Sequence, residues 1–332
     1  MGFEENEISI NASGGTELTK RLLQSSLPSD LLDNFQIISS RIRELDEDKI
    51  RVLFLHDLPQ DPESAKLADP AYRDKFHKFV FVSEWQYAQY QTVLGFPYDL
   101  KSIVLENCIV PIENHEKPRD KIRLAYFSTP HRGLDILVPV FKELAKRYPN
   151  IHLDVFSSFK IYGWEDADKQ FEPLFEECRN HPQITYHGSV PNDELRSHLK
   201  QSHILAYPST WIETSCRVIM ESMSAGMLCV HPNYGALPMT GAGLTFMYPG
   251  DTDKNKHAQQ FYGALEEAVK LMDTNEESLQ AHLKFAKMYA DGRFNDKKVT
   301  AGWEATLRQL LRQYPDAEQR KFPKELFVYK PS

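Results

Sequence analysis

Short apolar runs recur along the chain and are separated by stretches of mixed polarity. Continuous apolar runs of this kind predict strands that are buried on both faces of a parallel sheet. Before residue 110 they are ISIN (8–11), FQIIS (35–39), RVLFL (51–55), FVFV (79–82) and SIVL (102–105). After residue 120 they are IRLAYFS (122–128), IHLDVFSS (151–158), QITYH (183–187), ILAY (204–207) and LCVH (228–231).

Helical periodicity lies between these runs. Residues 85–94 predict a helix, and Ser83 stands where a side chain would cap its start. An amphipathic pattern follows the run at 122–128, and a second apolar stripe occupies positions 261, 265, 268, 269 and 272. A last helix is predicted from about 297 to 314. Strands that alternate with helices predict an α/β fold with parallel sheets.

The length allows two domains. A chain of 332 residues with 41% hydrophobic content can build two cores of ordinary size. The stretch between Pro111 and Lys121 is polar, bears a second proline and lacks periodicity, so it is the predicted linker. The predicted divisions are 1–115, 116–300 and a C-terminal helix and tail at 301–332.

Composition excludes several classes of function. The net charge of −8 and the pI near 5.9 argue against binding to nucleic acid or to an anionic membrane surface. No run of about 18 apolar residues and no basic-then-apolar leader is present, so a cytoplasmic location is expected. Four cysteines are too few for a disulfide framework and lack the companions of a zinc site. They are expected to be reduced.

The stretch from Ala206 to His231 carries the chemistry around which the chain is organised. It predicts a strand, a Pro-Ser loop, a helix opening near Thr214, a stop at Gly226 and a further strand. Ligands of parallel sheets bind where a strand ends and the next helix begins. Glu213 and Glu221 would then flank a helix start about 12 Å apart at about 1.5 Å per residue.

The amides of Thr214, Ser215 and Cys216 would point out of that helix start, where they favour a diphosphate. A ligand that is partly hydroxyls and partly diphosphate would suit this arrangement. Each residue also has an ordinary structural interpretation. Arg217 and Glu221 could form a surface pair, Glu213 could complement the helix dipole, and Ser215 could be a simple cap.

Three further positions are candidates for the same chemistry. The diglycine Gly14-Gly15 precedes a helix and could approach a phosphate closely. His56 follows a strand directly, where a functional side chain or an ordinary loop histidine would stand. Arg132 lies between a strand and a helix, where a guanidinium could bind phosphate oxygens.

Two D-x-D strings, Asp46 to Asp48 and Asp166 to Asp168, could in principle hold Mg²⁺ or Mn²⁺ on a sugar-nucleotide diphosphate. Neither follows a buried strand, so both are interpreted as solvated charge. The sequence therefore predicts no metal site. Arg132 and the helix amides would neutralise a leaving diphosphate.

The pattern P-S-x-x-x-E-x7-E, from Pro208 to Glu221, followed by M-S-A-G and an apolar strand, resembles the donor-site signature of retaining, family-four-type glycosyltransferases. That family has the GT-B fold, in which two Rossmann-like domains face a cleft. The resemblance implies a nucleotide-diphosphate-sugar donor on the second domain and a glycan, lipid-linked or small-molecule acceptor on the short first domain. It implies transfer with retention of anomeric configuration and no cofactor besides the donor.

The resemblance also implies roles for individual residues. Glu221 would bind the ribose, Glu213 the transferred sugar, and Thr214 to Cys216 with Arg132 the diphosphate. The family commonly has a second basic residue near Arg132, and Ser128, Thr129 or His131 could compensate for it here. Further donor-side positions are given by likeness to the family's loops and strand ends: Gly14 and Gly15 opposite the donor, and Val190 at the nucleobase. By the same likeness His56 would be a catalytic-site residue that faces the cleft, near the donor sugar and the acceptor. The terminal helix would return to the first domain, with Trp303 as its anchor.

Two other functions fit the same residues. A nucleotide-sugar epimerase shares the fold but needs acid and base groups on both sides of its cleft. A non-catalytic nucleotide-sugar-binding subunit would bind donor without turnover. Because the first domain is short, a protein partner or a second copy of the chain could complete an acceptor site.

Overall fold

The computed structural model describes residues 14–274 and 276–322, which divide into two compact units. Of the described residues, Thr19–Glu106 and Val299–Phe322 form the first unit, and Gly14–Leu18 together with Asn107–Lys298 form the second. The division therefore falls at 106/107 and 298/299, whereas the sequence suggested 115/116 and 300/301. Residues 107–121 belong to the second unit because they pair with it, as in the bridge between Ile109 and Asn295.

The first unit is built on a four-stranded parallel sheet in the order β1-β2-β3-β4. The predicted run ISIN lies outside the described residues, and the other four predicted strands are confirmed. The strands are β1 Phe35–Ser39, β2 Ile50–Leu55, β3 Lys78–Phe81 and β4 Ser102–Val104. The helices are α1 Gly15–Ser26, α2 Ser29–Leu32, η1 Pro62–Ala68, α3 Pro70–Arg73, α4 Glu84–Leu94, α12 Asp296–Gln313 and α13 Ala317–Arg320. The first residues of α1 and α12 belong to the second unit.

Helix α4 begins as the sequence predicts, because the Ser83 side chain accepts a hydrogen bond from the Gln86 amide. Helix α12 contributes its buried face to this unit. The Trp303 ring is fully buried and meets Phe54 of β2 edge-on, with ring centroids 4.8 Å apart. The buried Arg51 side chain donates from Nη2 to the Arg320 carbonyl at 2.7 Å, which joins α13 to the same unit.

The second unit is built on a six-stranded parallel sheet in the order β10-β9-β8-β5-β6-β7. Its strands are β5 Ile122–Phe127, β6 Ile151–Phe156, β7 Ile184–Tyr186, β8 Ile204–Ala206, β9 Leu228–Pro232 and β10 Phe246–Tyr248. Its helices are η2 Pro130–Arg132, α5 Leu134–Arg147, η3 Phe159–Tyr162, η4 Glu165–Phe171, α6 Glu172–Asn180, α7 Asn192–Gln201, α8 Arg217–Ser224, α9 Leu237–Gly241, α10 Lys254–Thr274 and α11 Glu277–Arg293.

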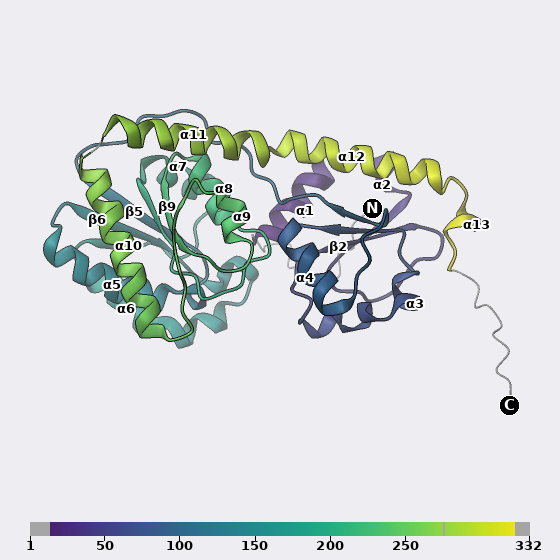
Figure 1. Ribbon diagram of the computed structural model, residues 1–332, viewed down its shortest axis with the longest axis horizontal. Helices are drawn as coiled ribbons and strands as arrows, with labels where there is room; N and C mark the ends of the chain where they lie inside the picture. The colour runs from purple at the N-terminus through teal and green to yellow at the C-terminus, as the bar shows by residue number, and fades with distance from the viewer. Residues whose placement is uncertain (1–13, 275, 323–332) are drawn as a thin grey trace. The chain divides into compact units, whose positions relative to one another are not determined.

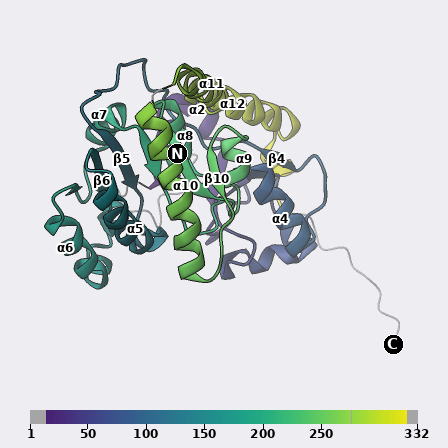
Figure 2. The same cartoon turned by 60° about the vertical axis from the view of Figure 1, so that its left-hand side comes forward.

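Helices cover this sheet as the apolar periodicity requires. Helix α10 packs against α5, and α11 packs against α8, as Figures 1 and 2 show from two directions. The predicted stripe on α10 is confirmed, since Phe261, Leu265, Ala268, Val269 and Met272 are all buried. None of the helices that the structure describes has the length and apolarity needed to cross a bilayer.

The strand order of the second unit determines where a ligand would bind. The chain winds from β5 through β6 to β7 in one direction, then crosses to β8 and winds through β9 to β10 in the other. The loops that follow β5 and β8 therefore diverge, and such a switch point leaves a crevice at the carboxyl ends of the strands.

Candidate functional site

Arg132 and Glu213 meet at the switch point of the six-stranded sheet. Arg132 ends the short turn after β5, and Glu213 lies in the loop after β8. The Arg132 Nη1 donates to Glu213 Oε1 at 2.7 Å, although the residues are 81 positions apart. The Tyr207 hydroxyl donates to the same oxygen at 2.7 Å. One carboxylate oxygen thus joins the loops that follow both central strands.

The pair is shielded from solvent. Glu213 is 7% exposed, and only 21% of the Arg132 side chain is accessible. Burial opposes the charge of Arg132, but Glu213 outweighs it and raises the pKa of the guanidinium. Burial, and then the charge of Glu213, raises the pKa of Tyr207. The site at neutral pH therefore holds a charged guanidinium and a neutral phenol.

Arg132 keeps a hydrogen-bond donor available. Its buried Nε has no hydrogen-bond partner within residues 14–274 and 276–322. A buried donor without a partner destabilises the fold by about 1–3 kcal/mol. A phosphate oxygen would satisfy this donor and add to the charge interaction.

Two glycines hold the loops of the site close together. Gly133 follows Arg132 with a φ of 103°, and a Cβ there would lie 2.1 Å from the Pro208 carbonyl oxygen. Gly235 has a φ of 55°, and a Cβ there would lie 2.4 Å from the Glu213 carbonyl oxygen. Only glycine adopts such backbone angles without strain and leaves room for this contact. The Ala236 amide also donates to the Glu213 carbonyl at 2.8 Å.

Aromatic side chains surround the arginine, and Trp211 and Phe159 among them were not identified from the sequence. The Arg132 guanidinium lies 5.6 Å from the centre of the Trp211 ring, and Trp211 is 47% exposed. His131 stacks on Phe159 with ring centroids 5.2 Å apart. Burial, followed by the charge of Arg132, lowers the pKa of His131 to about 4. The signal available in the sequence for Trp211 was a large aromatic residue two positions after the strand-end Pro208-Ser209 pair.

The helix that follows Glu213 differs from the prediction. Helix α8 begins at Arg217, with Cys216 as the residue before its first turn, so Thr214 and Ser215 precede the helix. Helix geometry therefore does not place the amides of Thr214, Ser215 and Cys216 at a helix start, although the sequence predicts this. It also gives no basis for the expected separation of about 12 Å between Glu213 and Glu221. The prediction of Ser215 as a cap is also wrong.

Glu221 pairs with Arg217, as the structural alternative proposed, but the pair is not on the surface. The Arg217 Nη2 donates to Glu221 Oε1 at 3.1 Å, and Glu221 is only 5% exposed. Arg217 also donates through Nη1 to the Cys108 carbonyl. Arg217 therefore links the start of α8 to the segment that enters the second unit.

The remaining predicted residues lie in different places. A Cβ on Gly15 would come within 3.1 Å of the Arg217 side chain, and one on Gly14 within 2.5 Å of the Tyr162 ring. Gly15 therefore lies beside the arginine that pairs with Glu221. Ser128 is 8% exposed at the end of β5, and Val190 packs partly buried on the core after β7. His56 belongs to the first unit, where burial lowers its pKa to about 3.

The D-x-D strings require one correction. Asp46 is exposed and accepts a hydrogen bond from the Asp48 amide at 2.9 Å. Asp168 is not solvated charge, because it accepts bonds from the Ser158 hydroxyl at 2.5 Å and the Phe159 amide at 2.7 Å. Asp168 therefore fastens η4 to the end of β6.

A different group of possible ligands is present at β6 and β7. Ligand atoms of Asp154, His187 and His198 lie within 4.8 Å of one another. His187 Nε2 is 2.7 Å from Asp154 Oδ1, and its ring stacks on Phe156 at 4.3 Å. This hydrogen bond explains the pairing without an ion. The sequence did not reveal the group because no two of its members are near neighbours in the chain. All four cysteines are buried and unpaired.

These features define an α/β protein of the GT-B class, with two parallel sheets and a crevice-forming switch point in the second. The family model described as glycosyl transferases group 1 matches residues 113–240, the segment that contains Arg132, Glu213 and Glu221. A curated relative from Arabidopsis thaliana, one of the subunits of phosphatidylinositol N-acetylglucosaminyltransferase, is 27% identical over 170 residues. That alignment covers 51% of this chain, and the chain spans about a third (34%) of that relative.

Solved structures share the fold over most of the chain. A glycosyltransferase from Rickettsia africae superposes with a TM-score of 0.68 at 13% identity, covering 93% of this chain and 84% of that chain. Sucrose-phosphate synthase from Thermosynechococcus elongatus gives 0.64 at 14% identity, with 90% and 79% covered. HepE of Anabaena, solved with UDP and glucose, gives 0.59 at 16% identity, with 88% and 82% covered. The family match and the fold together support a glycosyltransferase.

Proposed function

We propose that the protein transfers a sugar from a nucleotide-diphosphate-sugar to an acceptor, with retention of anomeric configuration and without a metal ion. The donor binds at the switch point of the six-stranded sheet. Arg132 binds the diphosphate, and Glu213 binds hydroxyls of the transferred sugar. Glu221 binds the ribose, and Val190 lies at the nucleobase. The first unit, including His56, contributes the acceptor side.

The observation that carries the proposal is the Arg132–Glu213 pair. It places a cation with an unused buried donor beside a buried carboxylate. A diphosphate ester of a sugar presents anionic oxygens and hydroxyls next to each other. The pair lies inside the segment that matches the glycosyl transferases group 1 family.

Arg132 is the cation of the Arg132–Glu213 pair, and it would neutralise charge on the leaving diphosphate. A fixed cation in a water-poor site stabilises developing negative charge without reorganisation. In the proposed reaction the bond from the anomeric carbon to the phosphate oxygen breaks, and the acceptor oxygen forms its bond on the same face. The acceptor proton passes to the leaving phosphate oxygen, so no residue is assigned as a general base.

A role inside a protein complex is the second candidate. The curated relative is named as one subunit of a transferase, and this chain spans a third (34%) of it. The chain would then bind the donor while a partner, or a second copy, contributed to acceptor binding. Size-exclusion chromatography with light scattering measures whether it self-associates.

The donor is tested by a thermal-shift panel of nucleotide-sugars, because a ligand that binds only the folded state raises its melting temperature. Transfer is then measured with the best donor by NMR of the anomeric proton of the product. A retained configuration supports the proposal, and an inverted one contradicts the mechanism. Conversion of the donor sugar without acceptor would indicate an epimerase, and binding without turnover a non-catalytic subunit.

The same assay tests the role of metals. Turnover in excess EDTA is expected to equal turnover in buffer with Mn²⁺. Activity that EDTA abolishes and Mn²⁺ restores would contradict the metal-independent mechanism and direct attention to the Asp154–His187–His198 group.

A further inference from the structure

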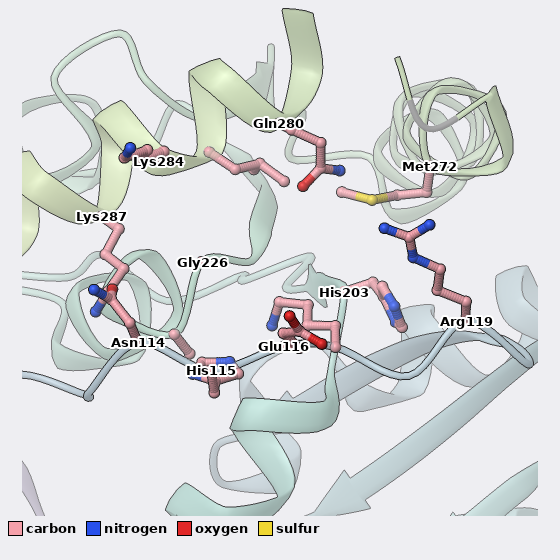
Figure 3. A pocket seen from close by; sticks show the side chains of 13 residues that line it. Asn114, His115, Glu116, Arg119, His203, Gly226, Met272, Gln280, Lys284 and Lys287 are labelled. Carbon is pink, nitrogen blue, oxygen red and sulfur yellow. The ribbon is translucent and has the colours of Figure 1, made fainter. Parts of the chain in front are cut away.

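The second unit contains a cavity that the proposed transfer does not use. It has a volume of about 440 Å³, within the range of roughly 300–1,000 Å³ that is typical of small-ligand sites. The segment 114–119 forms one wall, and helices α10 and α11 form another through Met272, Gln280 and Lys284. Figure 3 shows the Arg119 guanidinium reaching toward Met272 and Gln280.

The cavity lies at the amino edge of the six-stranded sheet. Of the residues that line it, His203 directly precedes β8, and Gly226 lies two residues before the start of β9. Arg132 and Glu213 instead follow the carboxyl ends of β5 and β8. The length of β5, at about 3.3 Å per residue, gives roughly 20 Å between the two edges. A ligand of the cavity would therefore not overlap the proposed donor.

Cations dominate the lining of the cavity although the chain is acidic. Lys117, Arg119, Lys284 and Lys287 face one carboxylate, Glu116, in a chain whose net charge is −8. Lys287 is fully used within the fold, because it donates to the Ile112 and Ser224 carbonyls and to Asp291 Oδ2.

The other three cations retain donors. Lys117 donates to the Ser202 carbonyl, which leaves two of its three N–H groups for a ligand. The side chains of Arg119 and Lys284 form no hydrogen bond or ion pair with other described residues, and both residues are exposed. Burial, and then the charge of Lys287, lowers the pKa of Lys117 to about 7. Within the described part of the chain, no carboxylate offsets that destabilisation of the Lys117 charge.

The lining also contains a hydrogen-bond acceptor, the imidazole of His115. His115 Nδ1 is 2.9 Å from the Glu113 carbonyl, so Nδ1 carries the proton. Burial lowers the pKa of His115, which leaves Nε2 as an acceptor at neutral pH. That buried Nε2 has no hydrogen-bond partner among the residues that the structure describes. The cavity therefore combines anion-binding donors with one acceptor that a hydroxyl could satisfy.

His203 forms a neutral part of the wall. Its Nδ1 accepts from the Arg123 amide at 3.0 Å, and its Nε2 is 3.0 Å from the Pro118 carbonyl. Both nitrogens are thus occupied. The groups left for a ligand are therefore the donors of Arg119, Lys117 and Lys284 and the acceptor of His115.

We propose that this cavity is a binding site for a phosphate monoester that bears a hydroxyl group, separate from the proposed donor site. The phosphate binds Arg119, Lys117 and Lys284, and the hydroxyl donates to His115 Nε2. The cavity is independent of the proposed transfer, since none of these residues is assigned to it.

Binding is tested by calorimetric titration of the full chain with inorganic phosphate and with glycerol 3-phosphate. Both are expected to bind saturably, and glycerol 3-phosphate more tightly because it has a hydroxyl for His115. UDP added in excess is expected to leave both affinities unchanged. Absence of saturable binding, or displacement of the phosphate by UDP, would overturn the proposal.

Three variants locate the site. Arg119→Ala and Lys284→Ala should each weaken glycerol 3-phosphate about tenfold, the scale of one hydrogen bond to a charged group. Glu116→Gln should tighten binding, because it removes the one carboxylate of the lining. Lys256→Ala and Arg312→Ala remove exposed helical cations elsewhere and are the matched controls. Equal affinities across all five variants would contradict the assignment.

A lipid headgroup would supply the same chemistry as a soluble ester. Vesicles that contain phosphatidic acid are therefore compared with neutral vesicles in a flotation assay. Phe285 and Met288 are 59% and 63% exposed on α11 near Lys284. If a membrane is the source, flotation with phosphatidic acid should fall on Phe285→Ser with Met288→Ser, while glycerol 3-phosphate binding should be unchanged. If soluble esters are the source, no vesicle arm should retain the protein, and the titrations above decide.

Discussion

Cationic side chains lie at both edges of the six-stranded sheet, but among the described residues a carboxylate pairs with Arg132 at the carboxyl edge and none pairs with Lys117 at the amino edge. At the carboxyl edge, Arg132 is held by Glu213, which Tyr207 also contacts. At the amino edge, Lys117 is bonded to a neutral carbonyl and stands near Lys287, with no acid partner in the described part of the chain. The first cation is fixed before any ligand arrives, whereas the second lacks a counter-charge that an anion could provide.

The difference indicates how each edge can act. A guanidinium oriented by a carboxylate is preorganised, which is the condition for stabilising charge that develops during a reaction. Cations that no carboxylate orients have no such fixed geometry, and they suit binding more than catalysis. Four predictions test this contrast.

The largest effect is expected for Arg132→Ala. Nucleoside diphosphate binding should weaken by about 1.5–3 kcal/mol, the range for hydrogen bonds to charged groups. Stability should fall as well, because Glu213 would stay buried without its cation. A UDP or GDP titration and a melting curve measure the two effects.

Arg123→Ala is the matched control for Arg132. Arg123 lies on strand β5 and pairs with the exposed Asp120 at 2.7 Å. Its loss should change stability by less than about 1 kcal/mol and leave nucleotide affinity unchanged. If the two variants bind nucleotide equally well, Arg132 has only a structural role.

Glu213→Gln should separate binding from turnover. The amide keeps the shape of the side chain but loses its charge, so nucleotide affinity should survive while turnover falls about tenfold to a hundredfold. Tyr207→Phe removes the second contact to Glu213 Oε1 and should give a smaller loss of turnover. The reverse order of effects would show that Tyr207, not Glu213, acts on the sugar.

Glu221→Ala should weaken free nucleotide and full donor alike, by about 1 kcal/mol for one lost hydrogen bond. Arg217→Ala is its control, because it breaks the same ion pair but retains the carboxylate. Both variants should be less stable than wild type, and only Glu221→Ala should lose ribose binding. Identical nucleotide affinities for wild type and Glu221→Ala would refute the ribose assignment.

The smallest effect is expected for Lys117→Met, and it depends on pH. Burial and Lys287 lower the pKa of Lys117 from 10.5 to about 7 in the fold. Between these values the unfolded chain holds the additional proton, so the free energy of unfolding should rise with pH from 7 to about 10. The variant should lack this rise.

Chemical denaturation of wild type and Lys117→Met at several pH values measures that difference. The stability of wild type relative to the variant should increase with pH. Lys256→Met is the control, because Lys256 is exposed on α10. A difference that stays constant from about pH 7 to about pH 10 would place the charge of Lys117 in contact with an acid or with solvent.

The strands and helices could be predicted where apolar residues recur in the sequence with the period of a strand or of a helix. The runs that became β1 to β9 and the stripe on α10 each lie within a few consecutive turns or residues, so local periodicity suffices. The start of α8 was placed three residues too early. The sequence from Thr214 to Cys216 contains ordinary capping residues, and the contact of Gly235 with the Glu213 backbone, which holds that loop, cannot be read locally.

The site was predictable as a set of residues but not as a set of contacts. Arg132 and Glu213 were identified separately, and their hydrogen bond joins positions 81 residues apart. Asp168 was interpreted as solvated because its hydrogen-bond partners, Ser158 and Phe159, lie 10 and 9 residues before it in the chain. The cavity at the amino edge of the six-stranded sheet is lined by five separate segments of the chain, none of which has a recognisable motif.

The contact between Gly235 and Glu213 has a consequence for redesign. A loop exchange that altered sugar selectivity would replace residues around Glu213, yet the backbone of that loop is shaped by a glycine that follows α8 and β9 in the chain. Libraries that diversify 209–216 should therefore leave Gly235 and Ala236 unchanged or import both segments from the same parent. The loop around Glu213 and the segment around Gly235 should therefore be exchanged together, although they are separate in the sequence.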